Sequence, residues 1–136
     1  MHAALAEGKK ALPLCTPNPP VGCVVVRDHA IVSRGHTNPP GQDHAEAMAV
    51  RDLPADLSQY SLFVTLEPCA FAGRTPSCAQ TLAQRKLQQV HVAILDPDER
   101  NNGKGIQILE QQGVQVTLGL LADQAMTDLA PYLGKS

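Results

Sequence analysis

The sequence predicts an α/β fold in which a five-stranded mixed sheet is covered by helices on both faces, so that the molecule has three layers. Two observations indicate this class. From about residue 44 onward, segments rich in β-branched residues alternate with helix-forming segments, which is typical of parallel strands joined by helices. Before that point, two such segments are separated only by a short polar turn, which predicts an antiparallel hairpin near the N-terminus.

The first part of the chain is expected to contain a helix and then the hairpin. Residues 1–12 are rich in alanine and favour a short helix. The prolines that follow hold residues 13–20 in a stiff, extended loop, which fixes the backbone around Asn18. The two strands of the hairpin are expected at residues 21–26 and 30–35, because the first is a run rich in β-branched residues and the second returns after a turn at Asp28-His29.

The rest of the chain is expected to continue the alternation of helix and strand. A helix begins near His44, after a loop dense in turn-forming residues. The expected helices are residues 44–51, 78–87, 106–110 and 121–133, and the expected strands are residues 61–66, 90–95 and 114–118. No repeat or linker divides the sequence, so residues 1–136 are expected to form one domain.

Composition argues against several classes of protein. The 136 residues carry a formal net charge of −2, and they contain no Trp, two Phe and two Tyr. Neither a basic surface for phosphate backbones nor an aromatic platform for stacked bases is expected, so nucleic acid is not an expected partner. No segment approaches the ~20 apolar residues of a membrane span, and no secretory signal is present, so a cytoplasmic location without membrane contact is expected.

Three side chains have the chemistry of a zinc site. His44 supplies an imidazole, and Cys69 and Cys78 supply two thiols. This set can hold a Zn²⁺ ion with a fourth position left open, which is the coordination of a catalytic site. Glu46, two residues after the histidine, supplies a carboxylate that can move protons during hydrolysis. The sequence therefore predicts one catalytic zinc ion per chain.

The expected secondary structure brings these residues together. Cys69 follows the strand at residues 61–66, and ligand sites in α/β sheets lie beyond the carboxyl ends of strands. Cys78 opens the next helix, where backbone N–H groups stabilise a thiolate. Residues two apart on a helix are separated by about 200°, so His44 and Glu46 can address one metal only if His44 is in the first turn.

Four segments carry a resemblance to a known family. They are Thr16-Pro17-Asn18-Pro19-Pro20-Val21-Gly22-Cys23-Val24, His44-Ala45-Glu46, Val64-Thr65-Leu66-Glu67-Pro68-Cys69 and Gly73-Arg74-Thr75-Pro76-Ser77-Cys78. Together they resemble the deaminase domain of riboflavin biosynthesis, the diaminohydroxyphosphoribosylaminopyrimidine deaminase of the cytidine deaminase-like superfamily. The interval of eight residues between Cys69 and Cys78 is the form of that branch. Asp96-Pro97 and Gly103-Lys104-Gly105-Ile106 extend the resemblance over nearly the whole chain.

The resemblance implies a three-layer cytidine deaminase-like fold and an enzyme that releases ammonia from an aminopyrimidine. The simplest substrate is the riboflavin precursor 2,5-diamino-6-(5-phosphoribosylamino)pyrimidin-4(3H)-one. The implied roles are zinc ligation by His44, Cys69 and Cys78, proton transfer by Glu46, contact with the pyrimidine by Asn18, and contact with the phosphoribosyl group by Arg74 and Thr75. Relatives are generally dimers or tetramers, so a homo-oligomer is expected.

Two departures from the family leave other hypotheses open. Ala70 and Phe71 stand where the family usually has Ser-His, and a phenyl ring cannot donate a hydrogen bond to phosphate. The substrate is therefore either that precursor, a dephosphorylated form, or another base, nucleoside or pterin-like metabolite. No reductase domain follows within the 136 residues, so a standalone deaminase domain is expected. A nucleic-acid editing deaminase and a purely structural zinc site are less favoured.

Overall fold

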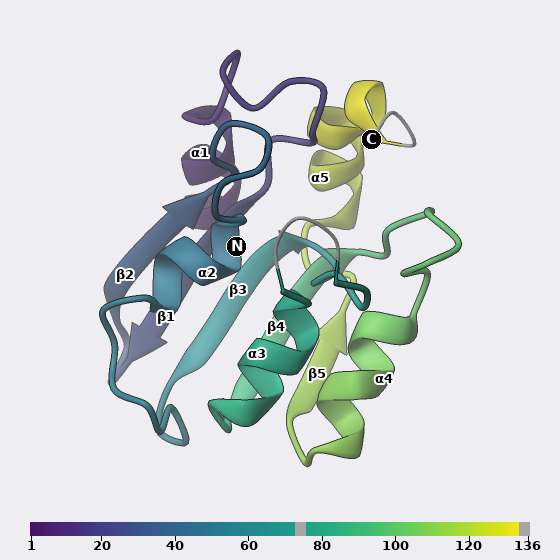
Figure 1. Ribbon diagram of the computed structural model, residues 1–136. Helices are drawn as coiled ribbons and strands as arrows, with labels where there is room; N and C mark the ends of the chain where they lie inside the picture. The colour runs from purple at the N-terminus through teal and green to yellow at the C-terminus, as the bar shows by residue number, and fades with distance from the viewer. Residues whose placement is uncertain (73–75, 134–136) are drawn as a thin grey trace.

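The computed structural model describes residues 1–72 and 76–133. Its strands are β1 (Gly22–Arg27), β2 (Ala30–His36), β3 (Ser61–Leu66), β4 (Gln89–Ile94) and β5 (Gln115–Leu118). Its helices are α1 (His2–Lys9), α2 (Ala45–Val50), α3 (Cys78–Gln84), α4 (Lys104–Gln111) and α5 (Ala122–Leu129), followed by a 3₁₀ turn at Ala130–Tyr132. Figure 1 shows the strands as one continuous sheet with helices in front of it and behind it.

The sheet has five strands in the order β2-β1-β3-β4-β5. Strand β1 is antiparallel to both of its neighbours, pairing Cys23 with Gly35 of β2 and with Val64 of β3. Strands β3, β4 and β5 are parallel to one another, with Val64 opposite Val92. The predicted hairpin and the predicted parallel strands are both confirmed. The parallel pairing also places the carboxyl ends of β3 and β4 at the same edge of the sheet.

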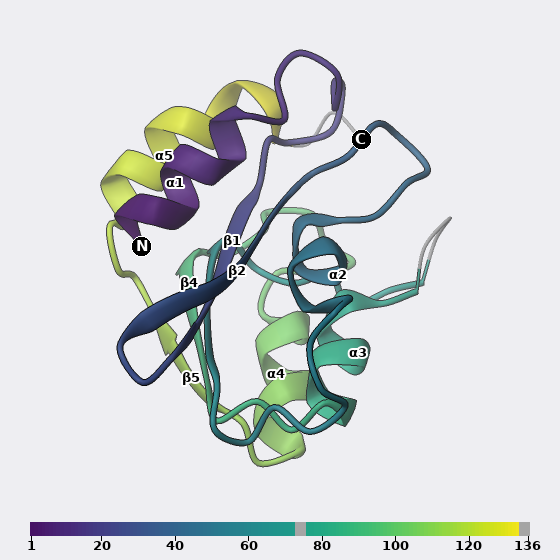
Figure 2. The same ribbon diagram turned by 90° about the vertical axis from the view of Figure 1, so that its left-hand side faces the viewer.

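Helices cover both faces of the sheet, which confirms the predicted three-layer class. Figure 2 shows the sheet edge-on, with α1 and α5 side by side on one face and α2, α3 and α4 on the other. The larger core lies beneath α2, α3 and α4 and includes Leu62, Leu82 and Leu109, all at most 1% exposed. A smaller core beneath α1 and α5 includes Leu5 and Leu129.

Helix α1 touches the backbone of β1 directly. A Cβ atom added to Gly22 would overlap the carbonyl oxygen of Ala4 and lie 2.5 Å from the amide nitrogen of Gly8. Only glycine allows this approach, because any side chain would separate the helix from the strand. The contact therefore sets how closely α1 packs on the sheet.

Several element ends differ from those predicted. The first helix ends at Lys9 and the third at Gln84, and the last helix becomes a 3₁₀ turn after Leu129, close to Pro131. Helix α4 is longer than predicted and starts at Lys104, directly after Gly103, whose φ is 91°. Helix termini depend on local hydrogen bonds that periodicity alone does not fix, so such shifts leave the order of elements unchanged.

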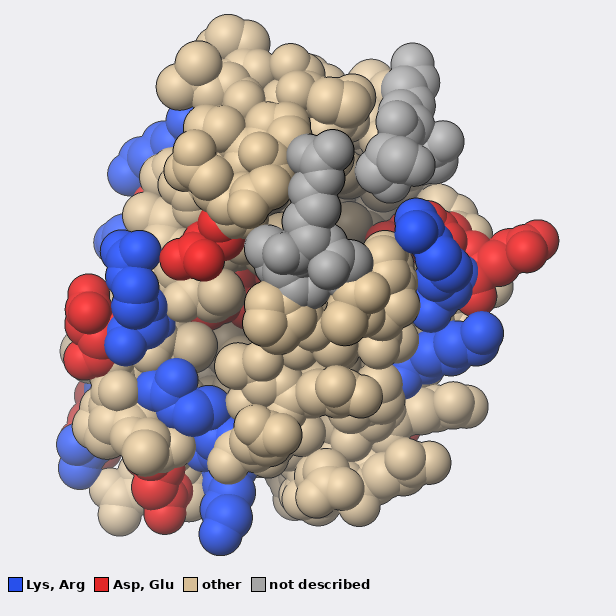
Figure 3. Space-filling model, viewed as in Figure 1, with Lys and Arg blue, Asp and Glu red and all other residues tan. Residues whose placement is uncertain are grey.

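The distribution of charge and the character of the helices bear on possible partners. On the face seen in Figure 3, Lys and Arg side chains are interspersed with Asp and Glu and do not gather into one basic patch. Within the part of the chain that the structure describes, no helix combines the length and the apolar character needed to cross a membrane.

Candidate active site

The structure brings the three predicted metal ligands into one group. His44 is the N-cap residue of α2, with extended backbone (φ −72°, ψ 168°), so it lies just before the first turn in which it was predicted. Cys69 follows the end of β3, and Cys78 is the first residue of α3. Nδ1 of His44 lies 3.7 Å from Sγ of Cys69 and 3.4 Å from Sγ of Cys78. One ligand atom from each residue lies within 4.8 Å of the other two.

These distances fit a tetrahedral zinc ion. With Zn–S near 2.3 Å and Zn–N near 2.0–2.1 Å, tetrahedral angles hold a nitrogen and a sulfur about 3.6 Å apart. The two nitrogen-to-sulfur distances, 3.7 and 3.4 Å, lie on either side of that value. One imidazole and two thiols are also soft donors that suit zinc. Three protein donors leave one of the four positions for a small ligand.

The two thiols interact so that one of them ionises easily. The backbone N–H of Cys78 donates a hydrogen bond to Sγ of Cys69 over 3.2 Å. The pKa of Cys69 is lowered to about 4, chiefly because the Cys78 thiol also donates to it and despite the opposing effect of burial, with His44 contributing further. The pKa of the Cys78 thiol is raised, because it donates that hydrogen bond and is buried. The backbone N–H at the start of α3 thus favours the thiolate form of Cys69, and not that of Cys78 as the sequence predicted, because it donates to the sulfur of Cys69.

Glu46 lies in the first turn of α2, beside the group of ligands. Its side chain is 5% exposed and borders a cavity of about 530 Å³, together with His44 and Cys69. Burial, followed by the negative charge of Cys69, raises the pKa of Glu46 to about 7, while His44 acts in the opposite direction. A carboxyl group with a pKa near neutrality can both accept and donate a proton.

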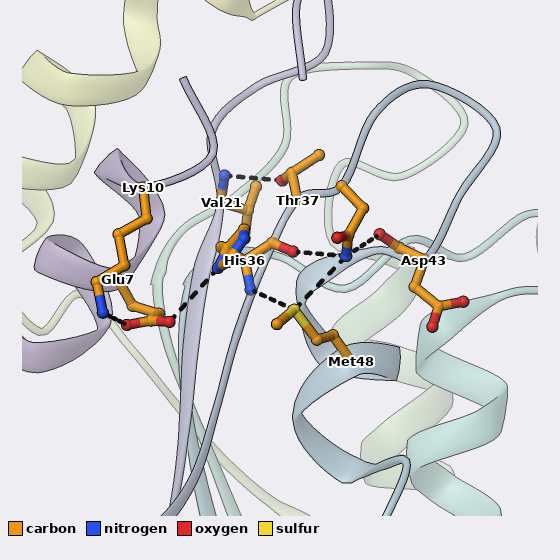
Figure 4. Close-up of polar contacts among 8 residues, drawn as sticks. Glu7, Lys10, Val21, His36, Thr37, Asp43 and Met48 are labelled. Atoms are coloured by element: carbon orange, nitrogen blue, oxygen red, sulfur yellow. Dashed lines mark hydrogen bonds and ion pairs between the residues drawn. The ribbon is translucent and has the colours of Figure 1, made fainter. Parts of the chain in front are cut away.

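Asn38 fixes the segment that leads into His44. Its side-chain Nδ2 donates to the carbonyl oxygens of His36 and Asp43, both over 3.1 Å, and its backbone N–H also donates to Asp43. Figure 4 shows the end of β2, marked by His36 and Thr37, close to Asp43, the residue that precedes His44. The loop from residue 38 to residue 43 is therefore closed at its base, which delivers His44 to a defined place.

Thr37 fixes the proline-rich loop in the same way. Its buried hydroxyl accepts a hydrogen bond from the backbone of Val21 over 3.0 Å and donates to the carbonyl oxygen of Pro19 over 2.8 Å. Asn18, directly before Pro19, borders the cavity. Its side chain has no hydrogen-bond partner among residues 1–72 and 76–133, so within that part of the chain its amide is available to a ligand.

Glu7 connects α1 to the same end of β2. Its carboxylate lies 3.4 Å from Nδ1 of His36 and 2.9 Å from Nζ of Lys10, as Figure 4 shows. Burial by itself would raise the pKa of Glu7, but the hydrogen bonds from Lys10 and His36 outweigh it and lower that pKa. The carboxylate form is therefore the one that stabilises this contact.

Glu67 clamps the strand that carries Cys69 to the start of α4. Its carboxylate is part of a side chain that is 3% exposed, and it accepts four backbone hydrogen bonds. The donors are the N–H groups of Asp96 (3.2 Å), Gly103 (3.0 Å), Gly105 (2.9 Å) and Ile106 (3.2 Å). A Cβ atom on Gly105 would overlap the carbonyl oxygen of Pro68, so glycine is required for this approach.

The segment between the two cysteines is held at both of its ends. The carbonyl oxygen of Cys69 accepts hydrogen bonds from the hydroxyl of Ser77 (2.9 Å) and the backbone N–H of Ala79 (3.0 Å). The backbone N–H of Ala70 donates to Oδ1 of the buried Asn101 over 2.8 Å. The positions of both sulfur atoms are thus set by hydrogen bonds close to each cysteine.

Of the three predicted substrate contacts, only Asn18 lies among the described residues. Arg74 and Thr75 lie outside the described residues. Phe71 borders the cavity, and the guanidinium carbon of Arg100 lies 4.0 Å from the centre of its ring.

The roles of Glu67, Asn101 and Thr37 were missed by the sequence analysis. A signal for Glu67 is present: a carboxylate ends an otherwise apolar strand, and two closely spaced glycines, Gly103 and Gly105, follow the next strand. Glycine exposes its backbone N–H, so the pair indicates a place where a buried carboxylate can be satisfied. Asn101 and Thr37 carry no comparable signal.

A family comparison identifies the class of protein to which this fold and metal-binding group correspond. The cytidine and deoxycytidylate deaminase zinc-binding region matches residues 1–94. The chain therefore belongs to this family of zinc-binding deaminase domains, as the sequence predicted.

Several individual relatives that match this chain are proteins of riboflavin biosynthesis. Riboflavin biosynthesis protein RibD of Chlamydia trachomatis is 41% identical over 133 residues, covering 98% of this chain and 36% of that protein. RibD of Acinetobacter baumannii matches with a TM-score of 0.92 and 39% identity, covering 97% of this chain and 37% of that one. The diaminohydroxyphosphoribosylaminopyrimidine deaminase/5-amino-6-(5-phosphoribosylamino)uracil reductase of Thermotoga maritima matches with a TM-score of 0.90 and 33% identity, covering 97% of this chain and 38% of that one. The predicted resemblance is confirmed, and the chain spans little more than a third of each of these relatives.

Proposed function

We propose that this chain is a zinc-dependent hydrolytic deaminase of an aminopyrimidine, and that its substrate is 2,5-diamino-6-(5-phosphoribosylamino)pyrimidin-4(3H)-one. The observation that carries the proposal is the grouping of ligand atoms from His44, Cys69 and Cys78 within 4.8 Å of one another, at a cavity that His44, Cys69 and the buried Glu46 border. The identity to RibD proteins over nearly the whole chain supports this substrate, because the Thermotoga maritima relative carries that deaminase activity in its name.

In this proposal, His44, Cys69 and Cys78 hold one zinc ion per chain. When bound, the ion supplies the Lewis acidity that activates water for hydrolysis at neutral pH. The chain contributes a rigid donor set, because the N-cap position of His44 and the hydrogen bonds around Cys69 and Cys78 leave these side chains little freedom. Such preorganisation is what a metal site with an exchangeable position requires.

Glu46 is the proposed proton carrier. Its carboxylate accepts a proton from the attacking water and delivers protons to the ring nitrogen and to the departing amino group. Water is consumed, ammonia leaves, and a carbonyl group remains on the ring. The side chain suits this task because it is almost fully buried yet borders the cavity.

Asn18, Arg74 and Thr75 are the proposed contacts to substrate. An amide such as that of Asn18 can donate to and accept from a pyrimidine edge, and the prolines on either side hold its backbone in place. Arg74 supplies a fork that suits phosphate, and Thr75 a hydroxyl, three and four residues beyond Phe71.

Ammonia release tests the assignment of Glu46. We expect Glu46→Gln to lower kcat at least about 100-fold, the usual contribution of a general acid–base group, while zinc content stays at one ion per chain. Glu110→Gln, on the exposed side of α4, is the matched control and should change neither. Ammonia release at the wild-type rate by the Glu46 variant would refute the mechanism.

Zinc content tests the ligands independently of activity. Cys78→Ser should lose most bound zinc, whereas Cys15→Ser should retain it, because Cys15 lies outside the group of ligands. Equal zinc content in the two variants would contradict the proposed donor set.

Two further proposals concern the form and location of the protein. We propose that residues 1–136 act as one deaminase domain in the cytoplasm, where thiols remain reduced and available to metal.

We also propose a homo-oligomer, because Leu118, Leu120 and Met126 expose between 45% and 51% of their surface at the end of β5 and on α5. Light scattering that gives the mass of a single chain at micromolar concentration would rule the oligomer out.

A further inference from the structure

We propose that Arg100, stacked on Phe71 and held by Asp98, binds an anionic group at the tail of the substrate and thereby selects a phosphate monoester over the corresponding alcohol. The inference rests on the proposed deaminase function and specifies which substrates that site prefers. It concerns a residue that the sequence analysis did not assign, at the border of the cavity that contains His44 and Glu46.

Arg100 lies where a substrate tail would leave the cavity. Phe71, Asp98 and Arg100 all border the same cavity as Glu46. The cavity measures about 530 Å³, so a single six-membered ring next to Glu46 fills only part of it. The Arg100 side chain is 53% exposed, which means that it is at the mouth and not at the floor.

The guanidinium group of Arg100 is held on one face and one edge. Its central carbon lies 4.0 Å from the centre of the Phe71 ring, in the geometry of a cation–π contact. Asp98 accepts hydrogen bonds from Nε over 3.1 Å and from Nη2 over 2.6 Å. An arginine fixed in this way loses little rotamer entropy when it binds a further group.

The other edge of the guanidinium is available. Nη1 of Arg100 has no hydrogen-bond partner among residues 1–72 and 76–133. The two nearby carboxylates are already engaged within the chain: Asp98 by Arg100, and Asp96 by the backbone of Asp98 (3.0 Å) and the side chain of Asn101 (2.9 Å). A phosphate oxygen that accepts from Nη1 would form a charge-assisted hydrogen bond, which a hydroxyl group cannot equal.

Phe71 has a defined part in this arrangement. A phenyl ring donates no hydrogen bond, so Phe71 by itself offers nothing to an anion. The face of the Phe71 ring instead positions the guanidinium group of Arg100, which can donate hydrogen bonds to an anion. The pair therefore provides an anion-binding donor at the position where the sequence had indicated only an apolar side chain.

The test compares the phosphorylated aminopyrimidine with its dephosphorylated form. We expect wild-type protein to prefer the phosphorylated substrate, and Arg100→Gln to reduce the ratio of the two kcat/KM values by about tenfold or more, the value of one charge-assisted hydrogen bond. The change should lie mainly in KM for the phosphorylated substrate. Phe71→Leu should reduce the same ratio by a smaller factor, and the double variant should be no worse than Arg100→Gln.

Arg27→Gln is the matched control. Arg27 also lies over an aromatic ring, 5.2 Å from the centre of Tyr60, and pairs with a neighbouring carboxylate, Asp28, over 3.7 Å. It does not border the cavity, so its substitution should leave the ratio unchanged.

Two results would overturn the inference. A wild-type ratio close to 1 would mean that no phosphate is selected, and an Arg100→Gln ratio within twofold of wild type would mean that Arg100 does not select it. In both cases ammonia would still be released from the aminopyrimidines, so the proposed deaminase function would stand. Failure of wild-type, zinc-loaded protein to release ammonia from either substrate would instead refute the proposed function.

Discussion

Replacing Glu67 by Gln should weaken the whole fold, because this carboxylate satisfies four backbone N–H groups in a buried place. Each carboxylate oxygen accepts two of the four hydrogen bonds. Glutamine keeps one carbonyl oxygen, but its amide nitrogen would point two donors at two backbone donors. The substitution thus removes two hydrogen bonds and leaves their N–H groups unsatisfied.

The size of the effect follows from that count. Hydrogen bonds to a charged acceptor contribute about 1.5–3 kcal/mol each, so losing two costs about 3–6 kcal/mol. A domain of this size has a free energy of unfolding of about 5–15 kcal/mol. Glu67→Gln is therefore expected to remove a large fraction of the stability and to loosen the connection between Cys69 and α4.

Urea unfolding followed by circular dichroism, at equal zinc concentration, measures this change. Glu110→Gln makes the same chemical substitution at an exposed site on α4 and should alter the free energy of unfolding by no more than about 0.5 kcal/mol. A loss below about 1 kcal/mol for Glu67→Gln, similar to the control, would refute the reasoning that this carboxylate clamps two parts of the chain.

Two further predictions concern α1. Gly22→Ala should lower the free energy of unfolding by about 1–3 kcal/mol, because its Cβ would overlap the carbonyl oxygen of Ala4; an unchanged thermal midpoint would contradict this close approach. Glu7→Gln should reduce stability above about pH 4.5, and the difference from wild type should shrink as the pH falls through the lowered pKa of Glu7, because protonation removes the ion pairs with Lys10 and His36. Urea unfolding between pH 3 and pH 7 measures that difference, and a difference that grows on acidification would refute the assignment.

The sequence was sufficient to predict the order of elements and the three side chains that the structure groups as candidate metal ligands, because each of the three could be assigned to the end of a predicted element. The mostly apolar run that became β3 is recognisable without its partners, and so is a cysteine at the start of a helix, as at Cys78. His44 could be assigned to a helix start because its spacing from Glu46 allows no other shared site. The difference between an N-cap and a first-turn residue depends on one pair of dihedral angles, which the sequence does not fix.

Features that depend on distant parts of the chain were not predictable in the same way. The four donors to Glu67 lie 29 to 39 residues away from it along the sequence. The contact between Gly22 and Gly8 likewise forms only when α1 packs on the sheet. In each case the residue type indicates that a close contact is possible. The contacting residue is determined by tertiary packing, so it cannot be predicted from the neighbouring sequence.

The hydrogen bonds from Ser77 and Ala79 to the carbonyl oxygen of Cys69 have an evolutionary consequence. They tie Cys69 to the end of the interval between the two cysteines, so substitutions or changes of length earlier in that interval need not disturb the sulfur atoms. Metal chemistry and substrate choice can then diverge separately in descendants of one ancestor. A change such as Phe71 can be accepted without loss of the metal centre, and a partner such as Arg100 can adapt to it from another part of the chain.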